Sequence, residues 1–303
     1  MLRFGWIFLF VLYCAPVLRA EENRCTERTV IIALRDSHTR SVPHTVKVAD
    51  FRVKVSGQPV KIAGATKASG SARVVLVLDA SSSMSSEPKW QAEEGIASEV
   101  IRRSPETTQF ALIVFADKVF KITKFGPSQP EVLDEISHLS VPRHGRTALH
   151  DAIFEAARLL EPALEGDSVV VVSDGGDNHS KVSHDLLQNT FLSQGLRIFS
   201  ARLIDREVAT EEEKLGAVEF GLLAETTGGT VRDINGPGFA TIGADFATEI
   251  ANYNVLHIVL EEPPRKAASL QVELMDPSGH KRKGLDLLFP QKLLPCTTLR
   301  ANP

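Results

Sequence analysis

The chain has 303 residues and a formal net charge of −4, with 43% hydrophobic and 24% charged residues. This composition is typical of a soluble globular protein with one large domain or two modest ones, and it excludes disorder as the main state. The charge balance lacks the excess of basic residues that binding to nucleic-acid phosphates requires, so we expect no nucleic acid partner.

The first twenty residues have the pattern of a cleavable secretory signal. A positive start, Met1 to Arg3, precedes an almost wholly apolar run from Phe4 to Leu12, and the small residue Ala20 stands before an acidic pair. The run is too short to span a bilayer comfortably. We therefore expect residues 1–20 to be removed, the mature chain to have no integral membrane span, and the protein to be secreted or periplasmic. An uncleaved N-terminal anchor is the alternative.

Two cysteines remain after the predicted signal, Cys25 and Cys296, one near each end of the mature chain. Two cysteines in an oxidising compartment favour a disulfide. Such a bridge closes a very long loop and would stabilise the fold by about 5 kcal/mol in the chain-entropy model, less any strain. Two unpaired thiols are the alternative.

The N-terminal segment, residues 21–70, is rich in β patterns and turn signals. A stretch of Gly, Ala and Ser at residues 64–71 marks its boundary with the next segment. The strands predicted here are residues 29–34, 45–48, 51–55 and 60–62.

The central segment, residues 71–252, has a different pattern, in which wholly apolar strands alternate with helices. This predicts an α/β domain with a doubly wound, mostly parallel sheet and helices on both faces. Strand 119–122 is the exception, because its short turn from the preceding strand makes that pair antiparallel. The predicted strands are 74–78, 110–115, 119–122, 168–172, 196–201 and 229–231, and the predicted helices are 89–103, 130–139, 148–160, 181–194, 215–226 and 239–251.

The C-terminal segment, residues 253–303, returns to β patterns, with strands predicted at 255–260, 270–274 and 285–289. β-rich segments therefore flank the α/β domain on both sides. We expect the two flanks to pack together as a small β-sandwich, with the α/β domain inserted between them. Two separate β extensions are the alternative.

Three loops of the central segment carry side chains with oxygen ligands. Asp79, Ser81 and Ser83 follow strand 74–78 at a spacing of two, Thr147 stands at the start of a helix, and Asp174 follows strand 168–172. Ligands of open α/β sheets bind at the carboxyl ends of the strands. Two carboxylates and three hydroxyls suit a hard cation, Mg²⁺ or Mn²⁺. Small hydroxyl ligands leave an open coordination position, which an acidic side chain of another molecule can fill.

The order Asp79-x-Ser81-x-Ser83, then Thr147, then Asp174 in Ser-Asp-Gly resembles the metal-ion-dependent adhesion site of von Willebrand factor A domains, across about residues 73–251. The resemblance implies that the hydroxyl oxygens bind one cation directly and that the aspartates often act through water. It also implies a protein partner that donates an Asp or Glu carboxylate.

Two further features extend the resemblance. Family members usually have glycine where this chain has Ser82, which implies a slightly stiffer loop here. The strand that begins at Asp50 and the turn Gly57-x-Pro59 resemble bacterial secreted proteins described as von Willebrand factor A-related.

Three functions are compatible with these patterns. The first is a binding module that is not an enzyme, and the second is a scaffold of an envelope or secreted complex with a dispensable metal site. The third is a serine hydrolase with Ser81 or Ser83 as nucleophile and His150 or His144 as base. Since the chain has no Gly-x-Ser-x-Gly elbow around these serines and no His-Glu-x-x-His motif, the binding module is favoured.

Overall fold

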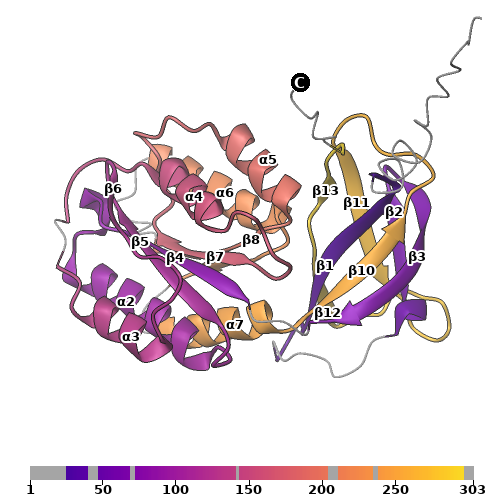
Figure 1. The fold of residues 1–303 in the computed structure, drawn as a ribbon, viewed down its shortest axis with the longest axis horizontal. Helices are drawn as coiled ribbons and strands as arrows, with labels where there is room; N and C mark the ends of the chain where they lie inside the picture. The colour runs from indigo at the N-terminus through magenta and orange to yellow at the C-terminus, as the bar shows by residue number, and fades with distance from the viewer. Residues whose placement is uncertain are drawn as a thin grey trace, which may run out of the picture.

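The computed structural model describes residues 25–39, 47–68, 72–140, 143–203, 211–234 and 238–296. Figure 1 shows two lobes side by side, an α/β lobe from the middle of the chain and a β lobe from its two flanks. The predicted signal, residues 1–20, lies outside the described residues. Within the described ranges, no helix is both long and apolar enough to cross a membrane.

A six-stranded sheet forms the centre of the α/β lobe. The strand order is β6-β5-β4-β7-β8-β9, and every neighbouring pair is parallel except β5 and β6. The mixed sheet confirms the predicted α/β class. The strands are β4 (Arg73–Asp79), β5 (Gln109–Phe115), β6 (Val119–Ile122), β7 (Ser168–Ser173), β8 (Arg197–Arg202) and β9 (Val231–Asp233).

Helices cover both faces of this sheet, because successive strand residues point to opposite sides. In β4, Val74, Leu76 and Leu78 pack under α2, α3 and α7, while Val75 and Val77 pack under α4, α5 and α6. A strand buried on both faces requires an unbroken apolar run. The helices are α2 (Glu87–Arg103), α3 (Gln129–Ser137), α4 (Leu149–Leu159), α5 (His184–Gln194), α6 (Glu211–Thr226) and α7 (Phe239–Ala251).

The β lobe is a single seven-stranded sheet, with the order β12-β1-β10-β3-β2-β11-β13, and each neighbouring pair is antiparallel. Strands from both flanks are neighbours in it, as β1 and β10 are, so the two ends of the chain build one lobe. The strands are β1 (Glu27–Asp36), β2 (Phe51–Val55), β3 (Gln58–Lys67), β10 (Tyr253–Val259), β11 (Ala268–Leu274), β12 (Leu285–Leu288) and β13 (Lys292–Leu293).

This sheet differs from the two-layered β-sandwich that we expected, because it is continuous and curled around one core. Strand β3 is the reason: residues 58–60 pair with β2, whereas residues 61–67 pair with β10. The shared strand keeps the ladder unbroken. An irregularity between His257 and Ile258 in β10 helps the sheet to bend. Side chains of β1, β2, β10 and β11 then meet in the interior.

Three local features differ from the prediction. Residues 64–67, expected in the stretch that marks a segment boundary, continue strand β3. Val48, expected at the end of strand 45–48, instead begins a 3₁₀ turn (Val48–Asp50) in which Lys47 N–H donates to Asp50 Oδ2 over 2.9 Å. Residues 45–46 of that predicted strand lie outside the described residues. Strand β13 was not predicted, since two residues carry no periodic signal. The disulfide between Cys25 and Cys296 is present as predicted.

Candidate metal centre

The candidate centre lies where the strand order of the α/β sheet reverses. β4 and β7 are parallel neighbours, with Leu78 paired to Val172, yet the chain passes through β5 and β6 between them. The loops that follow two such strands run apart from each other and leave a crevice at the sheet edge. Ligands of open α/β sheets bind in this crevice. Asp79 ends β4 and Asp174 directly follows β7, so the topology brings these two predicted ligands to the same edge.

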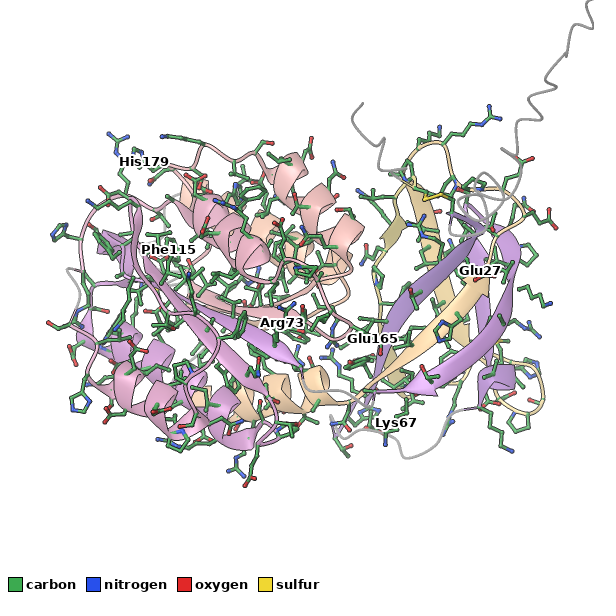
Figure 2. All side chains as sticks on the ribbon, in the orientation of Figure 1. Glu27, Lys67, Arg73, Phe115, Glu165 and His179 are labelled. Atoms are coloured by element: carbon green, nitrogen blue, oxygen red, sulfur yellow. A yellow bond between two sulfur atoms is a disulfide. The ribbon has the colours of Figure 1, made fainter. Side chains whose placement is uncertain are left out.

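This edge of the sheet faces away from the β lobe. Figure 2 shows Arg73, the first residue of β4, on the side of the β lobe, and Phe115 at the opposite end of the α/β lobe. Phe115 pairs with Asp79 in the parallel register. The candidate centre is therefore presented at the far end of the α/β lobe, where the β lobe does not cover it.

The first loop places two hydroxyls at ligand spacing. Asp79 Oδ1 accepts a hydrogen bond of 2.9 Å from Ser81 N–H, which turns the chain sharply after β4. Ser81 Oγ and Ser83 Oγ are then 3.2 Å apart. Neighbouring oxygen ligands of an octahedral Mg²⁺, each about 2.1 Å from the ion, are about 3.0 Å apart. The donor chemistry and the spacing of these two residues therefore fit the predicted cation.

The second loop is tied to both of the others. Ser82 N–H donates to Gly145 O over 3.2 Å, and Gly145 N–H donates to Ser82 Oγ over 2.9 Å. Thr147 N–H donates to Asn178 Oδ1, while Thr147 O accepts from Asn178 N–H, each over 3.0 Å. Thr147 is buried at this junction. The hydroxyl of Ser82, where the family usually has glycine, thus holds the loop that carries Thr147.

The third loop shows a residue that the sequence interpretation missed. Ser173 Oγ donates to Asp79 Oδ2 over 2.6 Å and accepts from Gly175 N–H over 3.0 Å. It joins the carboxylate of the first loop to the backbone of the third. Gly175 is required here, because its φ is +88° and a Cβ would lie 2.8 Å from Ala217 Cα. The available signal was the small polar residue at the end of an apolar strand.

Negative charge is concentrated beneath the loops. Asp79 is fully buried, and burial, followed by the charge of Asp174, raises the pKa of Asp79 to about 7. Glu93 on α2 is also fully buried, and burial, followed by the charge of Asp79, raises the pKa of Glu93 well above its usual range. A cation held by the two aspartates would offset their repulsion.

Glu93 is the second residue that the sequence interpretation missed. It shares the core-facing side of α2 with Ile96, Ala97 and Val100, at the helical spacing that marks one face. That spacing was the available signal. Among the described residues, no group of three or more His, Cys, Asp or Glu side chains forms a metal site. A site at this edge therefore depends on the hydroxyls as well as the carboxylates.

The two histidines proposed as general bases are placed differently from each other. His144 is exposed, whereas His150 Nδ1 lies 3.0 Å from Asp177 Oδ2. Asp177 also accepts from the backbone of His150 and Ser180, at 2.9 and 3.0 Å, which ties the third loop to the start of α4. Across the described part of the chain, no hydrogen bond joins a histidine to Ser81 or Ser83.

Fold and site together define a doubly wound α/β domain with carboxylate and hydroxyl side chains at its strand-order reversal. Residues 74–176 match the family model of the von Willebrand factor type A domain. The chain therefore carries a von Willebrand factor A domain, and all five predicted ligand positions fall inside the matched range.

Solved structures show the same fold. A von Willebrand factor type A protein from Catenulispora acidiphila aligns with a TM-score of 0.51 and 12% identity, over 89% of this chain and 73% of that chain. Proximal thread matrix protein 1 from the mussel byssus, solved with a zinc-occupied metal-ion-dependent adhesion site, aligns with a TM-score of 0.52 and 21% identity, over 64% of this chain and 50% of that chain. A comparison with curated proteins finds no match.

Proposed function

We propose that this protein is a secreted or periplasmic binding module without catalytic activity. Its von Willebrand factor A domain would hold one divalent cation, Mg²⁺ or Mn²⁺, and bind an Asp or Glu carboxylate of a protein partner. The bound cation would supply a Lewis-acidic coordination position for that carboxylate. The residues that would hold the cation are Asp79, Ser81, Ser83, Thr147 and Asp174.

The observation that carries this proposal is the 3.2 Å separation of Ser81 Oγ and Ser83 Oγ above a buried pair of aspartates. The hydrogen bonds to Asp79 and Thr147 already hold the three loops together. Because the loops need little rearrangement, ion binding loses little to ordering.

One observation favours a binding module over a serine hydrolase, and another favours secretion. A nucleophilic serine needs a base within hydrogen-bond reach, and in the described structure neither Ser81 nor Ser83 has a histidine partner, while His150 pairs with Asp177. The disulfide between Cys25 and Cys296 supports an oxidising compartment.

The test is a calorimetric titration of Mg²⁺ and Mn²⁺ into the wild-type protein and into Asp79→Asn and Ser81→Ala. We expect binding near one ion per chain in the wild type and at least about a tenfold loss in either variant. The matched control is Ser137→Ala, whose hydroxyl caps α3 by donating to Asp134 O and which should bind as the wild type does. A wild-type protein that binds neither ion would contradict the proposal.

Partner capture then separates the binding module from the scaffold. Wild-type protein immobilised with Mg²⁺ should retain a partner that EDTA releases and that Asp79→Asn does not retain. Capture that survives both EDTA and Asp79→Asn would instead support a scaffold with a dispensable metal site.

A further inference from the structure

Exposed basic side chains gather on the loops around the metal centre, although the whole chain has a net charge of −4. Besides the proposed ligands Asp79 and Asp174, five basic residues stand here against four acidic ones, Glu87, Asp117, Asp151 and Asp177. Asp177 pairs with His150, and Asp151 accepts from the backbone of Lys181, so most of the exposed, unpaired charge is positive. We call the basic residues the basic rim. They are Lys89, Lys118, Arg143, Arg146 and Lys181.

Lys89 brings one positive charge directly to the centre. It lies in the first turn of α2, and its Nζ donates a 2.7 Å hydrogen bond to the backbone oxygen of Ser83. An ammonium group beside a proposed ligand disfavours a second cation and favours an incoming anion.

The segment Arg143 to Arg146 lies against the first loop through the two hydrogen bonds between Ser82 and Gly145. Arg143 clamps this segment onto α2, since its guanidinium stacks 5.5 Å from the ring of Trp90 and pairs with Glu87 at 3.0 Å. Arg146 is exposed and immediately precedes Thr147. Among the described residues it has no ion-pair partner, so its charge is available to a ligand.

Lys118 lies in the turn between β5 and β6, on another side of the centre. Ala148 N–H donates to Ala116 O over 2.7 Å, and a Cβ at Gly145 would lie 3.5 Å from Asp117 Cγ. The turn is therefore adjacent to the loop of Thr147. Lys118 is exposed and, within the described ranges, forms no ion pair.

A divalent cation would balance the charges of Asp79 and Asp174, so the rim would set the sign of the remaining field. A positive rim attracts a ligand with more charge than one carboxylate and steers its approach. We propose that the partner presents an acidic segment, in which the carboxylate that reaches the cation is flanked by further Asp or Glu side chains. This rests on the proposed function.

A protein segment fits better than a sulfated glycan. Glu87 and Asp117 interrupt the rim, and Glu87 offsets the charge of Arg143. A densely sulfated chain is favoured by a continuous basic surface, whereas a peptide can place its carboxylates individually.

The test compares two blocked pentapeptides, Gly-Gly-Glu-Gly-Gly and Asp-Asp-Glu-Asp-Asp, titrated into the Mg²⁺-loaded protein at about 50 mM and about 300 mM salt. We expect the wild type to bind the acidic peptide about tenfold more tightly at low salt, with a smaller preference at high salt. The double variant Lys118→Gln/Arg146→Gln should lose most of this preference, because an exposed charge contributes up to about fivefold. Its affinity for the glycine peptide should not change.

The matched control is Lys61→Gln/Lys67→Gln, which removes two exposed charges from β3. Figure 2 shows Lys67 on the β lobe, far from His179 at the metal-centre end. Mg²⁺ titration of each sample distinguishes the two failures. Wild-type protein that binds no Mg²⁺ would contradict the proposed function. Mg²⁺ binding with equal affinity for both peptides would overturn only the proposal that the partner presents an acidic segment. Metal-independent binding of a heparin oligosaccharide in preference to the acidic peptide would also overturn the proposal of an acidic partner segment.

Discussion

Glu93 Oε1 accepts a 2.9 Å hydrogen bond from the backbone N–H of Asp79, and neither side chain reaches solvent. Helix α2 thereby holds the residue at which β4 ends and the first loop of the centre begins. Burial raises the pKa of Glu93 and so favours its neutral acid. Glu93 therefore acts here as a hydrogen-bond acceptor that positions the loop.

Substitution of Glu93 tests this positioning role. Glu93→Gln keeps an acceptor for Asp79 N–H and should change the free energy of unfolding by less than about 1 kcal/mol. Glu93→Leu has a similar volume but leaves the buried N–H unpaired, which should cost about 1–3 kcal/mol. Urea denaturation in EDTA measures both. If the leucine variant is as stable as the glutamine variant, the hydrogen bond does not hold the loop.

Ion binding should depend on pH through Asp79. Its pKa of about 7 in the ion-free protein means that a proton competes with the cation below that pH. The affinity for Mg²⁺ should fall about tenfold between pH about 8 and pH about 6, with proton release on binding at the lower pH. Calorimetry in two buffers of different ionisation enthalpy measures both quantities. An affinity that does not change over this range would contradict the elevated pKa.

The same shift predicts the pH dependence of stability without the ion. Because the native state of Asp79 binds its proton more tightly than the unfolded state, with pKa values of about 7 and 3.8, stability should fall as pH rises from about 4 to about 7. Asp79→Asn should flatten this part of the profile. Thermal unfolding in EDTA is the measurement, and a wild-type profile no steeper than that of the variant would argue against it.

Glu249 on α7 should be important for stability, because it joins the two lobes. Its Oε1 lies 2.6 Å from Arg232 Nη2 and 3.0 Å from Arg35 Nη1, and Arg35 belongs to β1. Glu249→Gln leaves two largely buried guanidinium groups beside a neutral amide, so we expect a loss of about 3 kcal/mol in the free energy of unfolding. The control is Asp134→Asn, whose pair with His138 is exposed and should change stability by less than about 0.5 kcal/mol. Equal losses in urea denaturation would contradict the prediction.

The disulfide should also contribute strongly. Cys25 and Cys296 are 271 residues apart in sequence, so their bridge restricts the unfolded chain by about 5 kcal/mol in the chain-entropy model. The double variant Cys25→Ser/Cys296→Ser should unfold at a lower urea concentration. Thiol titration of the denatured, unreduced protein should find no reactive thiol from this pair. Two reactive thiols would show that the bridge does not form in solution.

The sequence by itself determined the class of the fold. Apolar runs such as residues 74–78 and 168–172 mark strands buried on both faces, and that signal is local, because each residue in the run must be apolar. Helix α7 (Phe239–Ala251) begins and ends where its pattern predicted. The order of Asp79, Ser81, Ser83, Thr147 and Asp174 along the chain was also sufficient to predict a candidate centre.

Tertiary structure alone decided which other groups complete that centre. Ser173 and Glu93 contact Asp79 from a neighbouring strand and from a helix, and no local pattern indicates such distant pairings. It also decided that the β lobe is one curled sheet, since β3 divides its hydrogen bonds between β2 and β10. The physical reason is shared: periodicity shows which face of an element is buried, whereas the partner that covers the face depends on how the whole chain packs.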